Sequence, residues 1–265
     1  MAEFSPSSKI DTTVPHSARV WNYWLGGTDN FAVDRQVGDQ VREVYPQIVE
    51  VARSARKFLV RVVRYLAGEA GIRQFLDIGT GLPTANNTHE VAQAVAPESR
   101  IVYVDNDPLV LVHAQALLIS TPEGATNYIE ADLRELDKVL SAAAATLDFS
   151  KPIAIMLLGI LGYIGNDDEA RSILKRLLDA VPSGSYLAMG DGTKTSEVHA
   201  EVERAVQEGG LDYTYRSPEQ IVRFFDGLEL LEPGVVSPPR WRPDPEADNS
   251  ITTEPLGRVG LGRKP

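Results

Sequence analysis

The sequence predicts an α/β fold in which a mostly parallel sheet carries helices on both faces. From Gln74 onward, apolar strand-like segments alternate with amphipathic helical patterns, which is typical of strands joined by crossover helices. The chain has 265 residues, 43% of them hydrophobic, enough for one such domain with additions. The expected strands lie near 74–78, 100–105, 127–130, 152–158 and 185–190, with two late strands near 229–235 and 258–262.

The region before the first strand is predicted to be helical. Residues 1–70 are interpreted as a helical extension packed on the core, and residues 71–265 as the main domain. Ser17 is expected to cap a short helix that runs to Leu25, and an amphipathic pattern predicts a long helix over 46–67. Later helix starts are indicated by the capping residues Asn87 with Glu90, Asp107 before Pro108, Ser196, and Ser217 with Gln220.

The turn after the first expected strand has the pattern of a nucleotide-cofactor site. Asp77 lies near the strand end, and Gly79, Thr80 and Gly81 follow, giving Asp-x-Gly-x-Gly. A dinucleotide-binding turn, Gly-x-Gly-x-x-Gly, has a third glycine where this chain has Thr84. That glycine allows close helix packing beside a pyrophosphate, so a cofactor without a pyrophosphate is favoured. An NAD-dependent oxidoreductase is kept as an alternative.

Two further acids lie at the ends of the next strands. Asp105, followed by Asn106, ends the second expected strand, where a ribose-binding carboxylate belongs in nucleotide-cofactor folds. Asp132, followed by Leu133, comes directly after the third. The carboxyl ends of parallel strands meet at one edge of a sheet, so the three acids are expected to face one site.

Composition excludes several function classes. The chain has no cysteine, which excludes disulfides and thiolate chemistry, and its four histidines lack metal-site spacing. A formal charge of −11 argues against a nucleic-acid partner. Residues 1–14 are polar, and the uncharged apolar run over 153–165 is too short to cross a bilayer. A cytoplasmic protein without a membrane partner is expected.

A family resemblance is carried by the block from Pro15 to Phe31, which ends in Leu-Gly-Gly-Thr-Asp-Asn-Phe. This block, the turn over 77–87 and the closing segment 260–265 resemble the actinobacterial DUF574 family of S-adenosylmethionine (SAM) dependent methyltransferases, and the likeness covers nearly the whole chain. Asp-x-Gly-x-Gly is similar to motif I of the class I SAM methyltransferases. The resemblance implies a Rossmann-like, seven-stranded sheet whose last strand inserts antiparallel, with an N-terminal helical cap.

The resemblance also assigns cofactor-binding residues. It implies that the glycine turn approaches the methionyl part of SAM and that Asp132 lies beside the adenine amino group. In the N-terminal cap, Tyr23, Asp29 and Asn30 are candidates for a closing element over the cofactor. Arg56, or alternatively Arg19, is a candidate for holding the carboxylate of SAM. The cofactor-binding set is therefore Asp77, Gly79, Thr80, Gly81, Asp105, Asn106, Asp132, Leu133, Tyr23, Asp29, Asn30 and Arg56.

The sequence contains no clear general base. Many relatives carry a histidine after the fourth strand, whereas this chain has Gly-Ile-Leu-Gly-Tyr over 159–163, so Tyr163 and His16 are the candidates considered. In-line methyl transfer does not require a base, and the expected activity is methyl transfer to a small-molecule acceptor. A SAM-binding regulatory or scaffold protein without turnover is the main alternative. The acceptor, the methylated atom and the oligomeric state are not predicted.

Overall fold

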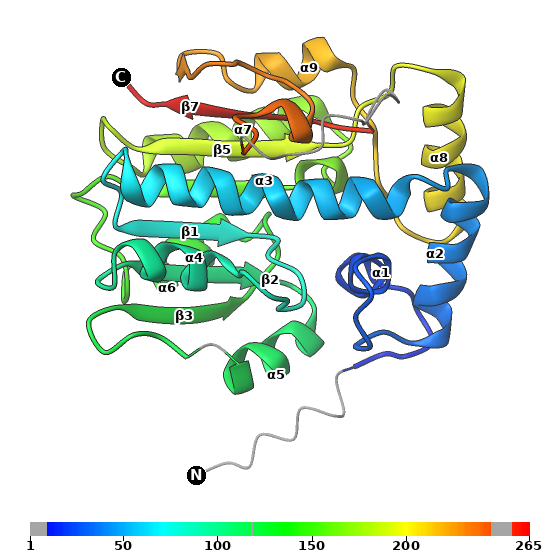
Figure 1. Ribbon diagram of the computed structural model, residues 1–265, viewed down its shortest axis with the longest axis horizontal. Coiled ribbons are helices and arrows are strands. Elements are labelled where there is room, and N and C mark those ends of the chain that lie inside the picture. The colour runs from blue at the N-terminus through cyan, green and yellow to red at the C-terminus, as the bar shows by residue number, and fades with distance from the viewer. Residues whose placement is uncertain (1–9, 118, 245–255) are drawn as a thin grey trace.

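The computed structural model describes residues 10–117, 119–244 and 256–265 (Figure 1). Residues 1–9 of the polar N-terminal stretch lie outside the described residues. Within the described ranges, no helix is both long enough and apolar enough to span a bilayer.

The elements follow one another from three N-terminal helices into an alternating α/β pattern. Their order is α1 (Ser17–Trp24), α2 (Ala32–Val44), α3 (Ile48–Gly68), β1 (Gln74–Ile78), α4 (Thr88–Val95), β2 (Arg100–Asp105), α5 (Pro108–Leu117), β3 (Ala125–Glu130), α6 (Leu136–Ala143), β4 (Ala154–Leu158), η2 (Leu161–Tyr163), α7 (Asp167–Asp179), β5 (Tyr186–Asp191), α8 (Glu197–Glu208), α9 (Pro218–Arg223), β6 (Glu229–Leu230), η3 (Pro238–Arg240) and β7 (Arg258–Arg263).

The strands form one sheet of seven in the order β3-β2-β1-β4-β5-β7-β6. Strands β1 to β5 pair in parallel, and β7 inserts antiparallel between β5 and β6. This confirms the predicted fold class, including the antiparallel last strand. The strand order reverses between β1 and β4, and in such sheets the crevice for ligands opens outside the carboxyl ends at that point.

Each face of the sheet carries a helical layer because alternate strand residues are apolar on both sides. Leu76, Ile155 and their neighbours pack under α6, α7 and α9. Phe75 and Met156 point the other way, against α3 and α4. Helices α1, α2 and α8 lie beyond the carboxyl ends of the strands, as Figure 1 shows, and share a third cluster that includes Val41 and Val202.

Most expected helix starts are confirmed. Asn87 with Glu90 and Ser217 with Gln220 form capping boxes. The start of α1 differs from expectation, because His16 and not Ser17 is its N-cap, with the Nδ1 atom of His16 accepting from the amide of Ala18.

Helix α2 has no counterpart in the sequence prediction. Its buried positions Asp34, Val37, Gly38 and Val41 follow helical spacing, but only two of them are large and apolar. A β-carbon at Gly38 would lie 2.6 Å from the ring of Tyr23. Glycine lowers helix propensity there while allowing α1 to approach closely. Strand β6 is also shorter than expected, and Pro233, which lacks an N–H, lies just beyond it.

Candidate functional site

A cavity of about 480 Å³ lies between the carboxyl ends of the strands and the N-terminal helices. Its walls come from the turns after β1 to β5, from α1 and α3, and from the segment over 210–215. This volume falls within the range of pockets for small molecules and cofactors.

The glycine turn over 79–81 lines the cavity at the carboxyl end of β1. Gly79 and Gly81 have φ angles of 73° and 67°, which glycine adopts without strain. A β-carbon at Gly79 would lie 2.8 Å from Ile160, whereas one at Gly81 would meet nothing within 4 Å. Thr80 lines the same wall. The backbone of this turn is therefore open to a ligand at Gly81.

Asp77 lies beneath the turn as a buried carboxylate. Its Oδ2 accepts a hydrogen bond of 2.6 Å from the hydroxyl of Thr88. Burial raises the pKa of Asp77 to about 6, against the opposing effects of Thr88 and Arg56. Arg56, from α3, lines the cavity and donates to the carbonyls of Ala85 and Asn86 at 3.2 and 3.0 Å. The guanidinium of Arg56 thus lies close enough to Asp77 to lower the pKa of that acid.

The acids at the ends of β2 and β3 meet at the same edge, as expected. Asp105 accepts from the amides of Gly81 at 2.8 Å and Asp107 at 3.0 Å, and burial raises its pKa. Asn106 donates to Asp132 Oδ2 at 3.3 Å. Asp105, Asn106, Asp132 and Leu133 all line the cavity.

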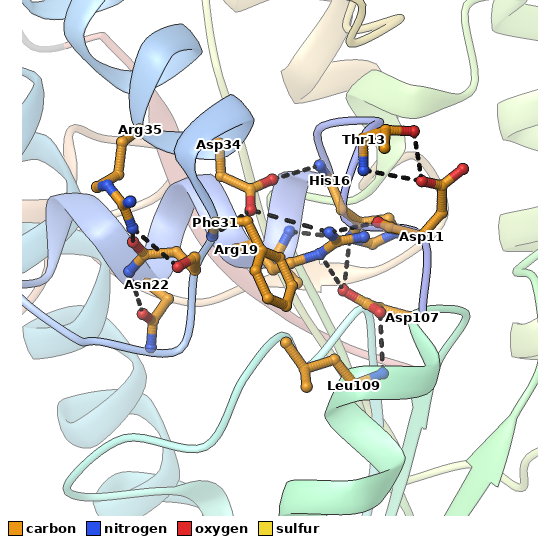
Figure 2. Close-up of polar contacts among 12 residues, drawn as sticks. Asp11, Thr13, His16, Arg19, Asn22, Phe31, Asp34, Arg35, Asp107 and Leu109 are labelled. Atoms are coloured by element: carbon orange, nitrogen blue, oxygen red, sulfur yellow. Dashed lines mark hydrogen bonds and ion pairs between the residues drawn. The ribbon is translucent and has the colours of Figure 1, made fainter. Parts of the chain in front are cut away.

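A buried ionic network joins the N-terminal segment to this edge (Figure 2). Arg19, 4% exposed, donates from Nε to Asp107 Oδ2 at 3.0 Å and lies 3.8 Å from Asp34. The amide of His16 donates to Asp34 at 2.9 Å. Because these partners occupy its guanidinium, Arg19 does not offer a free group to a cofactor carboxylate.

Three predicted residues of the N-terminal cap lie away from the cavity lining. Tyr23 donates to Asp39 at 2.7 Å, and Asn30 donates to the side chain of Asn22 at 2.8 Å. Asp29 lies 3.6 Å from His113. Their neighbours supply the lining from this segment instead: Trp21, Asn22, Trp24 and Leu25.

The two candidate bases, Tyr163 and His16, both line the cavity. Tyr163 packs edge-on against Tyr213, with ring centroids 4.8 Å apart. Burial raises the pKa of Tyr163, so its hydroxyl remains protonated at neutral pH. The Nδ1 atom of His16 caps α1 and lies 3.2 Å from Asp107 Oδ2. Neither geometry is that of a free general base.

The sequence matches the model of the S-adenosyl methyltransferase family over residues 3–265. The chain belongs to this family. It is therefore a SAM-dependent methyltransferase. No match was found among proteins of curated function.

Two solved structures are similar over nearly the whole methyltransferase chain. A DUF574 family protein from Streptomyces avermitilis is 44% identical, with a TM-score of 0.94, over 97% of this chain and 100% of that one. A protein from Thermobifida fusca YX is 43% identical, with a TM-score of 0.89, over 99% of both chains. The magnesium protoporphyrin IX methyltransferase of Synechocystis PCC 6803, solved with bound S-adenosyl-L-homocysteine (SAH), is 13% identical over 93% of each chain. Its TM-score of 0.56 supports the fold alone.

Three residues of the methyltransferase cavity escaped sequence reasoning. Asp191 ends β5, and Tyr213 and Tyr215 come from the segment after α8. The signal for Asp191 was present, since it is an acid at a strand end like Asp105. No local pattern identifies the two tyrosines, because only the tertiary fold brings their segment over β5.

Proposed function

We propose that this methyltransferase transfers the methyl group of SAM to a small-molecule acceptor that the cavity encloses. One observation carries the proposal. The cavity runs without interruption from Asp77, Asp105 and Asp132, at the carboxyl ends of β1 to β3, to a mainly apolar chamber, which is the part of the cavity lined by α1, α8 and the segment over 210–215. A cofactor at the acids would present its methyl group toward that chamber. A cavity of this size fits a small molecule better than a polymer.

The residues at the acid end fit the parts of the cofactor. In this proposal the open backbone at Gly81 and Thr80 approaches the methionyl part, and Arg56 holds its carboxylate. Asp105 accepts hydrogen bonds from the ribose hydroxyls. Asp132 and Leu133 lie against the adenine.

Bound SAM supplies an electrophilic methyl group on a sulfonium, which an acceptor takes by in-line displacement. The contribution of the chain is then to align the acceptor and to exclude water. Trp21 and Trp24 of α1 line the chamber and serve the second task. The acidic charge of the chain argues against a nucleic-acid acceptor.

A cytoplasmic location, an actinobacterial origin and the division of the chain near residue 70 remain proposals. The second is supported by the sources of the two similar structures. The third is supported by the change from three successive helices to the alternating pattern at β1.

Methyl-labelled SAM tests the proposal. The full chain is incubated with a fractionated small-molecule extract and, separately, with DNA, RNA and protein from the same cells. The proposal predicts label in compounds of low molecular mass. Label confined to a polymer fraction would contradict a small-molecule acceptor.

A further inference from the structure

The end of the cavity over β4 and β5 contains a buried carboxylate that the cofactor assignment leaves unused. Asp191 is 6% exposed and lines the cavity at the end of β5. Its Oδ1 accepts a short hydrogen bond from the hydroxyl of Tyr213. Within the described residues, Oδ2 makes no hydrogen bond of good geometry, although the amides of Gly162 and Gly192 face the carboxylate and lower its pKa. Buried carboxylate oxygens normally have partners, so this one is available to a ligand that enters the chamber.

The Asp191–Tyr213 pair can only accept hydrogen bonds from a ligand. Tyr213 uses its single hydroxyl proton on Asp191 and already accepts from the amide of Gly192 at 3.0 Å. A carboxylate has no proton to give while it is ionised. The ligand group that binds Asp191 therefore carries an N–H or O–H. Tyr163, Tyr215 and Arg258 also line this part of the cavity and can donate to other parts of the ligand.

A cluster of tyrosine rings lies beside the carboxylate, which Tyr213 contacts through its hydroxyl. Tyr213 packs edge-on against Tyr163 on one side and Tyr215 on the other, with centroid distances of 4.8 and 4.9 Å. Tyrosine rings attract a cation through their quadrupole, and the attraction strengthens where water is excluded. A carboxylate within an aromatic cluster is suited to bind a nitrogen that carries or acquires positive charge.

We infer that the methyl acceptor is an amine whose nitrogen lies between Asp191 and the Tyr163–Tyr213–Tyr215 cluster. The inference rests on the proposed function and names its substrate class. In the reaction, the lone pair of the neutral amine forms the new N–CH3 bond while the S–CH3 bond breaks. The sulfonium becomes a neutral thioether, and the nitrogen becomes a cation. The ionised Asp191 stabilises that cation, which leaves as the methylated ammonium and exchanges its proton with water after release.

The electrostatics favour nitrogen over oxygen as the methylated atom. Positive charge moves from sulfur to the acceptor atom during transfer, and groups that stabilise charge where it develops accelerate a reaction. Burial raises the pKa of Asp191 to about 6. Above that pH the carboxylate is ionised and stabilises a positive charge on nitrogen, but it is too weak a base to ionise a phenol, whose pKa is about 10.

Matched compounds test the inference. A panel of aryl and alkyl amines, each paired with the alcohol and the carboxylic acid of the same skeleton, is offered to the full chain with methyl-labelled SAM. Binding of the same compounds to the chain saturated with SAH is measured by calorimetry. We expect amines to bind and to be labelled in preference to their partners. Labelling of alcohols or acids instead, or no amine that binds more tightly than its partners, would overturn the inference.

Variants separate this inference from the proposed function. Asp191→Asn should weaken amine binding roughly tenfold to a hundredfold, as expected for loss of a hydrogen bond to a charged group, while SAH affinity stays within about twofold. Tyr213→Phe keeps the ring and should give a smaller loss. Asp226→Asn, which removes an exposed carboxylate outside the cavity lining, is the charge-matched control.

The two proposals fail in different ways. Equal amine affinity in Asp191→Asn and the parent chain would overturn the amine inference alone. If neither SAM nor SAH bound to the parent chain, the proposed function itself would fail.

Discussion

At the scale of single residues, the cavity concentrates carboxylates in surroundings that disfavour their charge. Burial raises the pKa of Asp77, Asp105 and Asp191. An acid whose pKa is higher in the folded than in the unfolded chain adds stability below its unfolded pKa, and this stability is lost as the pH rises through the folded value. Ionising these acids at neutral pH therefore costs stability, and we expect a ligand that donates hydrogen bonds to them to reduce that cost.

Asp77→Asn isolates this effect at one position, because the amide oxygen still accepts from Thr88. The parent chain should lose stability relative to the variant as the pH rises from about 4 to 7, by roughly 1 to 3 kcal/mol in total. Chemical denaturation without ligand at several pH values, at fixed ionic strength, measures the difference. Parallel pH profiles for the two proteins would show that Asp77 is not held at a raised pKa.

Asp105→Asn tests the ribose assignment with little change of shape. The amide can still accept from Gly81 but presents one fewer acceptor and no charge. SAM affinity should fall roughly tenfold to a hundredfold. Equilibrium dialysis with labelled SAM gives the value, and the melting temperature without ligand reports on folding. A folded variant with unchanged affinity would place the ribose elsewhere.

Sequence reasoning located the strand-end acids because their position depends only on strand direction. Asp77, Asp105 and Asp132 follow apolar runs, so their meeting at one edge could be predicted. The position of Tyr213 depends on how the segment after α8 returns over β5, which involves non-local packing. Asn30 contacts Asn22 instead of the cavity for the same reason.

At the scale of elements, α1 is fixed to the cofactor edge by buried charge. Arg19 contacts Asp107, which begins α5 and donates its amide to Asp105. Helix α1 also lines the cavity through Trp21 and Trp24. The position of α1 and that of Asp105, the proposed ribose-binding acid, are therefore linked by direct contacts.

Arg19→Met should weaken the attachment of α1 to the edge of the sheet. Removing one partner of a buried pair leaves the other charge uncompensated, so we expect the unfolding free energy to fall by about 3 to 5 kcal/mol. If α1 detaches locally instead, we expect faster proteolysis within residues 10–31. Arg42→Met is the control, because its pair with Asp39 is exposed and its loss should change stability by less than about 1 kcal/mol. Equal denaturation and proteolysis profiles for the two variants would contradict the role of Arg19.

The strands and most helices could be predicted from periodicity and caps, whereas α2 could not. Its apolar stripe is narrow, and Gly38 weakens it as a helix on its own. Packing against α1 and α8 stabilises it. Elements that depend on their neighbours in this way leave little trace in a single sequence.

At the scale of the whole molecule, one cavity has two ends with different chemistry. The carboxyl ends of β1 to β3 present acids and an open backbone, and those of β4 and β5 present a carboxylate among aromatic rings. The N-terminal helices cover both ends. The sheet and the meeting of the strand-end acids at one edge could be predicted from the sequence, whereas the second end depends on how α8 and the following segment pack.

Hydrogen exchange of the full chain, with and without saturating SAM, tests whether SAM binds in this cavity. If SAM binds there, we expect slower amide exchange at residues 79–82, 105–107 and 131–134 and along α1, because these segments line the proposed cofactor end or cover it. NAD at the same concentration should leave these rates unchanged. Protection by SAM at other segments only, or equal protection by NAD, would contradict the assignment of this cavity to SAM.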